Sequence, residues 1–315
     1  VLLHRNIVAN ALQSEAWHAP AMALIPAGDQ PTVVCALPLY HIFAFTVCMV
    51  LFMRIGGKLV LIPNPRDLPG TLGVLSKERF HVLPAVSTLF NGLANHPDFA
   101  KADWSHLKLS VGGGMAVQAA VAKLWLEKTG TPIIEGYGLS ETSPSACCNP
   151  VDSQAFSGTI GVPISSTWMK CIDDAGNEVP SGQPGEIVIK GPQVMAGYWQ
   201  RPDETAKVMT ADGFFKTGDI GVMDARGWFR IVDRKKDMVL VSGFNVYPNE
   251  VEDVVAQLPG VLECAVVGMP DERTGEAVKL VIVKKDPGLT EERVREHCRA
   301  NLTAYKQPKV IEFRT

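Results

Sequence analysis

Residues 107–142 read LKLSVGGGMAVQAAVAKLWLEKTGTPIIEGYGLSET, and this stretch decides the fold. Its apolar runs at Leu107–Val111 and Pro132–Glu135 predict two short strands. Between them, Ala116–Lys128 carries apolar residues at helical spacing, which predicts a helix. A strand, a helix and a second strand in this order favour two parallel strands with the helix packed on the sheet. A run of three glycines directly follows the first strand.

The same alternation of elements extends over residues 1–150. We expect a helix over 6–17, a strand over 32–37, a buried helix over 42–54 and a strand over 58–62. The uncharged run Val33–Met53 is long enough to span a membrane, but it is interrupted by Pro38, Tyr40, His41 and Thr46. We therefore favour a core location and keep membrane contact as the alternative. The predicted architecture is α/β, a largely parallel sheet with helices on both faces.

Residues 151–233 have a different texture, in which short strands alternate with glycine and proline turns. We expect strands over 169–172, 186–190, 219–224 and 228–232. The segments 173–177 and 224–227 have the composition of hairpin turns. This part of the chain is therefore predicted to form a β-rich subdomain packed on the first.

A third texture begins at residue 234, where a charged cluster precedes a strand. We then expect a helix over 248–257, strands over 261–267 and 277–283, and a helix over 290–300. The predicted domains are accordingly residues 1–233 and a small, mobile α+β domain over residues 234–315.

Composition excludes several classes of protein. The chain has 30 basic and 33 acidic residues and a net charge of −3, which disfavours a general nucleic-acid binder. Hydrophobic residues make up 46 %, too many for a disordered chain. The seven cysteines are odd in number and lack metal-site spacing, which argues against a disulfide framework or a structural zinc site. A reducing, cytoplasmic setting, with most cysteines buried as small apolar residues, fits better.

Two glycine-rich loops are candidate ligand sites. Gly112, Gly113 and Gly114 let a ligand approach the backbone at the start of a helix, where anions are favoured. A tight turn between strand and helix is the alternative for this loop. Because ligands gather at the carboxyl ends of strands in open α/β sheets, the loop that follows the next strand is expected to share the same pocket.

That second loop carries side chains suited to a nucleotide. Tyr137 offers an aromatic face, Ser140 offers a hydroxyl, and Glu141 offers a hard oxygen ligand for Mg²⁺. The flanking Gly136 and Gly138 give the backbone its freedom. A capped loop with a solvated glutamate is the alternative.

Two further motifs lie in the second half of the chain. In the predicted turn Lys216-Thr217-Gly218-Asp219, the carboxylate suits two vicinal ribose hydroxyls, although an ordinary turn aspartate is the alternative. The charged run 233–237 stands where the texture changes, which suits a mobile interdomain joint. A solvated charge run is the alternative there.

Taken in this order, the motifs resemble the adenylate-forming superfamily: acyl-CoA synthetases, peptide-synthetase adenylation domains and beetle luciferases. The loop Tyr137-Gly138-x-Ser140-Glu141, the turn Thr217-Gly218-Asp219 and the joint Asp233-Arg234 carry the resemblance. Residues 233–250, DRKKDMVLVSGFNVYPNE, and residues 38–44 are most similar to bacterial long-chain fatty acyl-CoA synthetases. The resemblance extends over nearly the whole chain.

The resemblance implies a large domain, of which residues 1–233 are the later part, and a small domain that rotates between two steps. A fatty carboxylate attacks the α-phosphate of ATP to give acyl-AMP and pyrophosphate, with Mg²⁺ as cofactor. The thiol of coenzyme A then forms the thioester and releases AMP. The alternatives are an acyl-AMP ligase that hands the acyl group to a carrier protein, and a non-catalytic nucleotide or acyl binder. We expect a cytoplasmic enzyme and leave open its oligomeric state and its peripheral contact with the inner face of the cell membrane.

The resemblance also implies roles for the nucleotide-facing residues. Gly112–Gly114 would line the adenine and acyl pocket, and Tyr137, between Gly136 and Gly138, would stack on adenine. Ser140 stands where the family usually has threonine and keeps the hydroxyl that contacts phosphate. Glu141 would hold Mg²⁺. Asp219 would bind both ribose hydroxyls, and Arg234 would add a charged contact.

The remaining implied roles concern the acyl group, the hinge and coenzyme A. His41 would lie near the acyl carboxylate, with a hydrogen-bonded core histidine as the alternative. Lys236 stands at the hinge position, and Ser242, Gly243 and Phe244 would border the pantetheine tunnel.

Two family segments have no counterpart in the sequence. The phosphate loop normally precedes a segment like Leu3–Asn6, and the adenylation lysine normally follows one like Tyr305–Lys309. Lys306 and Lys309 match the element before that lysine. We therefore expect a fragment of a longer ligase that has no ligase activity by itself.

Overall fold

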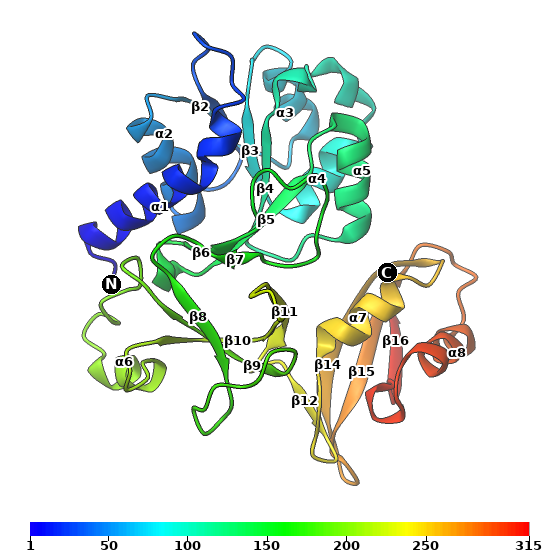
Figure 1. Ribbon diagram of the computed structural model, residues 1–315. Helices are drawn as coiled ribbons and strands as arrows, with labels where there is room; N and C mark the ends of the chain where they lie inside the picture. The colour runs from blue at the N-terminus through cyan, green and yellow to red at the C-terminus, as the bar shows by residue number, and fades with distance from the viewer. Residues whose placement is uncertain (315) are drawn as a thin grey trace. The chain divides into compact units, whose positions relative to one another are not determined.

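The computed structural model describes residues 1–314, and the first half of the chain contains the predicted parallel sheet (Figure 1). The sheet follows the order β2-β1-β3-β4-β5, and every neighbouring pair in it is parallel. Beyond β5, two antiparallel strands extend it as β6 and β7. The strands are β1 (Thr32–Cys35), β2 (Lys58–Leu61), β3 (Val82–Ala85), β4 (Leu109–Gly112), β5 (Ile133–Gly138), β6 (Ser145–Cys148) and β7 (Val162–Pro163).

Helices cover both faces of this sheet, as the alternation of elements predicts. Neighbouring residues of a strand point to opposite faces, so Val33 and Val34 belong to different buried clusters. The cluster that contains Val34 includes residues of three helices: α3 (Leu68–Leu75), α4 (Ser87–Asn95) and α5 (Ala119–Thr129). The cluster that contains Val33 includes residues of α1 (His4–Met22), a π-helix η1 (Ala44–Val50) and α2 (Leu51–Arg54).

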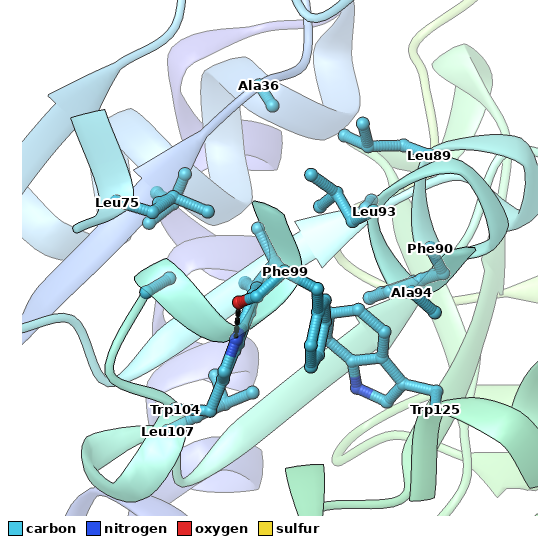
Figure 2. Close-up of a cluster of buried hydrophobic side chains, with 14 of the residues drawn as sticks. Ala36, Leu75, Leu89, Phe90, Leu93, Ala94, Phe99, Trp104, Leu107 and Trp125 are labelled. Atoms are coloured by element: carbon cyan, nitrogen blue, oxygen red, sulfur yellow. Dashed lines mark hydrogen bonds between the residues drawn. The ribbon is translucent and has the colours of Figure 1, made fainter. Parts of the chain in front are cut away.

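Aromatic side chains pack against one another within the cluster under α3, α4 and α5 (Figure 2). Phe99 in η2 (Pro97–Lys101) stacks on Trp104, the first residue of η3 (Trp104–His106), with ring centroids 4.5 Å apart. Trp125 of α5 is fully buried and donates its indole N–H to the Ser110 hydroxyl at 2.9 Å. This contact fixes α5 against β4, so the glycine loop between them has two anchored ends.

The uncharged segment predicted as a buried helix is helical and lies in the core. The predicted buried helix is confirmed, and its first part is the π-helix η1, followed by α2. Its wider turn closes where Leu51 donates its N–H to the carbonyl of Thr46, five residues earlier. Ala44 and Cys48 have no exposed surface. Within residues 1–314, no helix combines the length and the apolar character that crossing a membrane would need.

The β-rich part forms a sheet in the order β11-β10-β9-β8. Its strands are β8 (Trp168–Ile172), β9 (Pro184–Lys190), β10 (Phe215–Met223) and β11 (Phe229–Arg234), and α6 (Pro202–Val208) lies between β9 and β10. The predicted turn at 217–219 is wrong, because β10 continues through it, with Gly218 at a φ of +75°. Hairpin turns are confirmed at Asp173–Asn177 and Asp224–Gly227.

A second mixed sheet follows, in the order β13-β12-β15-β14, with β16 parallel to β15. The α+β prediction for this region is confirmed, since Val251 of one helix and Val294 of another pack with Leu280 of the sheet. Its elements are β12 (Val239–Val241), β13 (Phe244–Val246), α7 (Pro248–Ala256), β14 (Val261–Asp271), β15 (Gly275–Lys284), α8 (Glu291–Asn301), η5 (Ala304–Lys306) and β16 (Val310–Arg314).

The chain divides into two compact units, each made of several separate segments, whereas the predicted domains were two continuous segments. The first comprises residues 1–170, 188–217 and 223–230, and the second comprises 171–187, 218–222 and the chain from 231 onward. The division into compact units describes packing and not movement. The mobility expected of residues 234–315 therefore stays a prediction.

Candidate functional site

The first glycine loop is shaped by packing within the chain. A Cβ on Gly112 would lie 2.6 Å from a methyl group of Val117 and 2.8 Å from one of Ile133. A Cβ on Gly113 would lie 3.0 Å from the ring of Phe43. Gly114 is exposed and has a φ of +79°. Internal contacts therefore explain the first two glycines, and Gly114 has the backbone conformation and exposure expected of a ligand loop.

Glu135 ties the two candidate loops together. It pairs with Gly112 in the register of β4 and β5, and its buried carboxylate accepts the N–H of Val117 at 2.9 Å. Burial raises the pKa of Glu135 to about 7. The sequence shows this residue only as the end of a strand, because nothing in it reveals that the side chain turns inward.

The second loop follows β5 and runs so close to the backbone at Pro144 that there is no room for a side chain at Gly138. Gly136 and Tyr137 are half-buried, whereas Gly138 and Ser140 are exposed. A Cβ on Gly138 would overlap the carbonyl of Pro144, so only glycine fits there. The turn η4 (Ser140–Thr142) then begins at Ser140.

Glu141 is held at both its backbone and its side chain. Its carbonyl accepts the N–H of Met195 at 2.7 Å, and its carboxylate accepts the hydroxyl of Tyr198 at 3.0 Å. Desolvation and the nearby Glu141 charge raise the pKa of Tyr198 to about 12, so this hydroxyl remains a donor. No sequence pattern points to Tyr198, which lies 57 residues from its partner.

The donor set around Glu141 is compatible with magnesium. Across the described part of the chain, residues 1–314, no group of three or more His, Cys, Asp or Glu side chains could hold a metal ion. A single carboxylate suits Mg²⁺, which proteins commonly bind through one or two carboxylates together with substrate phosphates.

His41 is exposed at the bend before η1, and its Nδ1 accepts the N–H of Phe43 at 3.2 Å. The alternative of a buried core histidine is therefore wrong for this residue. His18 and His81 are the buried histidines that fit that description. The proximity of His41 to an acyl carboxylate stays a prediction.

In the second unit, Asp219 and Arg234 lie together. Asp219 is 8 % exposed on β10, and its carboxylate lies 3.6 Å from the Nε of Arg234. The peptide before Asp219 is also held, because Gly218 donates its N–H to Glu186 at 3.1 Å and accepts the N–H of Lys235 at 2.8 Å.

The charged run around the predicted hinge is anchored before Lys236. The buried Asp233 carboxylate accepts the backbone N–H groups of Arg234 at 2.7 Å and Asn249 at 2.9 Å. Burial raises the pKa of Asp233. Lys236 itself is exposed in the turn after β11. The alternative of a solvated charge run thus fails for Asp233 and holds for the position of Lys236.

Ser242 and Gly243 form the tip of the β12–β13 hairpin. Their φ values of +51° and +83° match a type I′ turn, which suits the twist of paired strands. The exposed ring of Phe244 stacks on Tyr305, with centroids 4.9 Å apart. The pantetheine role of these three residues stays a prediction.

The structure thus brings the predicted residues together in groups. The two glycine loops adjoin through paired strands, and Asp219 meets Arg234 in the second unit. Convergence of all groups on one nucleotide pocket stays a prediction.

Comparisons with known proteins identify the type of chain. The family model described as AMP-binding enzyme matches residues 1–199, and the model of the AMP-binding enzyme C-terminal domain matches residues 250–315. A long-chain-fatty-acid–CoA ligase of Escherichia coli O6:H1 is 55 % identical over 314 residues, covering 100 % of this chain. Ligases with the same name from Yersinia pestis and Haemophilus influenzae are 54 % and 49 % identical, again over the whole chain. The chain spans 55 % of the length of each of these relatives.

Solved structures agree with the family match. ATP-bound MatB from Rhodopseudomonas palustris has a TM-score of 0.91 and 32 % identity, covering 99 % of this chain and 60 % of its own. The o-succinylbenzoate CoA synthetase MenE from Bacillus subtilis, in complex with the acyl-adenylate OSB-AMP, has a TM-score of 0.83 and 25 % identity. That match covers 99 % of this chain and 62 % of MenE.

Proposed function

The chain belongs to the AMP-binding enzyme family, and on this premise we propose that the protein is a long-chain-fatty-acid–CoA ligase. It activates a fatty acid with ATP to acyl-AMP and pyrophosphate, then forms the thioester with coenzyme A and releases AMP. The observation that carries the proposal is 49–55 % identity over the whole chain with ligases of that name.

The first step requires charge to be neutralised around the phosphates of ATP. Glu141 is the residue that would hold Mg²⁺, and the ion would supply positive charge to the phosphate oxygens when bound. Tyr198 fixes the Glu141 carboxylate through its 3.0 Å hydrogen bond. The hydroxyl of Ser140 would add a hydrogen bond to phosphate from the first position of η4.

Recognition of the nucleoside falls to three residues. Tyr137 would stack on adenine, because an aromatic ring packs well on the flat face of a base. Asp219 would accept hydrogen bonds from both ribose hydroxyls, and Arg234, already beside Asp219, would contact the nucleotide. His41, exposed at the bend before η1, would lie near the acyl carboxylate.

The second step needs a path for the thiol to the acyl carbonyl. We propose that the small domain turns at Lys236 between the steps, so that Ser242, Gly243 and Phe244 border the pantetheine arm. The exposed position of Lys236 in the turn after β11 supports this joint, and the anchored Asp233 lies three residues before it.

The compartment proposed is the cytoplasm. All seven cysteines, which lie within residues 1–314, are free thiols, and six of them are buried. Loose contact with the inner face of the cell membrane is part of the proposal, because the substrate is apolar. Flotation with vesicles of bacterial lipid, with and without oleate, tests that contact.

The test of function uses the complete natural protein with fatty acids of C8 to C18. Pyrophosphate release that depends on fatty acid, and AMP release that also depends on coenzyme A, are the expected results. Pyrophosphate exchange without a thioester on free coenzyme A would instead identify an acyl-AMP ligase that serves a carrier protein. Nucleotide binding without either product would identify a non-catalytic binder.

A further inference from the structure

Glu186 has a buried carboxylate whose two oxygens serve different partners. The residue is 8 % exposed on β9. One oxygen accepts the N–H of Gly218 at 3.1 Å, and the other accepts the ammonium of Lys235 at 3.1 Å. A buried carboxylate is unfavourable unless it is paired and hydrogen-bonded, and here it is both.

Lys235 completes a closed set of contacts around Gly218. Its ammonium also pairs with Asp174 at 2.7 Å, and its backbone N–H donates to the carbonyl of Gly218 at 2.8 Å. Both polar groups of Gly218 are therefore held, one by Glu186 and one by Lys235. Gly218 has a φ of +75°, whereas residues of a regular β-strand have strongly negative φ values.

The residue held by this arrangement is Asp219, which follows Gly218 directly. The direction of the Asp219 side chain depends on the peptide that precedes it. We propose that Glu186 and Lys235 are a positioning pair, which orients Asp219 to receive the ribose hydroxyls of ATP. The inference rests on the proposed function, because it assigns Asp219 to the nucleotide.

Substitution of the pair has a specific expected effect. In Glu186→Gln, an amide nitrogen replaces one acceptor, so the side chain can no longer accept from both Gly218 and Lys235. A contact to ribose is present in both the ground state and the transition state. Its loss should therefore raise KM for ATP with little change in kcat.

The experiment compares ATP with 2′-deoxy-ATP in the complete natural protein. For Glu186→Gln we expect KM for ATP to rise about tenfold, while KM for the fatty acid stays unchanged. The preference for ATP over 2′-deoxy-ATP should fall by a similar factor. Glu178→Gln is the matched control, because it makes the same chemical change at an exposed residue that pairs with Ile172 at the base of the Asp173–Asn177 hairpin.

Two further variants separate positioning from general destabilisation. Lys235→Met removes the exposed end of the pair, and Lys235→Arg keeps the positive charge and should restore most of the preference. In a background of Asp219→Ala, Glu186→Gln should have no additional effect on KM for ATP. An unchanged preference in both Glu186→Gln and Lys235→Met, or full additivity with Asp219→Ala, would overturn the pair.

Binding of AMP by calorimetry keeps the two proposals apart, because it requires no turnover. A wild-type protein that binds AMP but makes no acyl-CoA would refute the ligase, and the variants would still test the pair through AMP affinity. Weaker AMP binding in Glu186→Gln supports the pair. Absence of AMP binding in the wild type would overturn both.

Discussion

The hydroxyl of Tyr198 donates a hydrogen bond to the carboxylate of Glu141 at 3.0 Å, across 57 residues of sequence. The backbone carbonyl of Glu141 is bound by Met195, from the same segment as Tyr198. A loop that is local in sequence is thus held from outside. This arrangement determines how well Glu141 is placed for any ligand.

Tyr198→Phe should weaken the first half-reaction while leaving the fold intact. The ring stays, but Glu141 loses one hydrogen bond, and bonds to charged groups contribute about 1.5–3 kcal/mol. We expect a roughly tenfold higher Mg²⁺ concentration for half-maximal adenylation. Stopped-flow pyrophosphate release at varied Mg²⁺ measures this. The matched control is Tyr40→Phe, at a residue that is 93 % exposed, and equal effects in both variants would contradict the assignment.

Glu141→Ala should damage adenylation more severely than Tyr198→Phe, because it removes the proposed Mg²⁺ ligand itself. Single-turnover formation of acyl-AMP should slow by on the order of a hundredfold. Glu127→Ala, on the exposed face of α5, serves as the control. Unchanged single-turnover adenylation in Glu141→Ala would remove this residue from the site.

Lys236→Pro should affect the two half-reactions differently. Proline fixes φ and removes the N–H, so it stiffens the turn between β11 and β12. Adenylation should be preserved, whereas thioester formation should slow by about tenfold or more. Ala225→Pro places the same residue in the β10–β11 turn and should spare both steps. An equal response of both half-reactions in Lys236→Pro would show that the hinge lies elsewhere.

Glu135→Gln should change how stability depends on pH. Burial raises the pKa of Glu135 from 4.5 to about 7, so the native state binds more protons than the unfolded state between these values. Stability therefore decreases as pH rises through this window, and glutamine, which cannot ionise, escapes that decrease. From pH 5 to pH 8, the variant should gain up to about 3 kcal/mol relative to wild type.

Urea unfolding at pH 5, 6, 7 and 8 measures this difference. Glu127→Gln on the exposed face of α5 should follow the wild-type pH profile. Parallel curves for wild type and Glu135→Gln would show that Glu135 does not titrate in this range.

The two strands and the helix of residues 107–142 were predictable because each has a pattern of apolar residues that is visible in its own short segment. The apolar runs of β4 and β5 and the spacing on α5 are local signals. Residues 63–106 carried no such prediction. Pro84 lies inside β3, and Gly70 and Gly73 lie inside α3, so both elements contain residues that usually weaken them.

Within the candidate site, motifs were predictable and their supports were not. Glycine-bounded loops mark themselves in sequence, and so do Glu141 and Asp219 within them. Glu186 and Asn249 are ordinary residues of a strand and a helix, and only folding brings Glu186 to Gly218 and Asn249 to Asp233. The predicted turn at Asp219 failed for the same reason, because strand pairing across the sheet overrides a local Gly-Asp signal.

The π-helix η1 has a geometric consequence for the residues that precede it. A π-helical turn contains about one residue more than an α-helical turn. The extra residue rotates the preceding chain by about 100° around the helix axis. Phe43, whose ring lies close to Gly113, and His41 precede η1, whereas Leu51 and Phe52 follow it and are buried. We expect removal of a single residue from 44–50 to rotate Phe43 and His41 by about this angle relative to the buried Leu51 and Phe52. The number of residues in this segment therefore sets the direction from which Phe43 and His41 face the glycine loop.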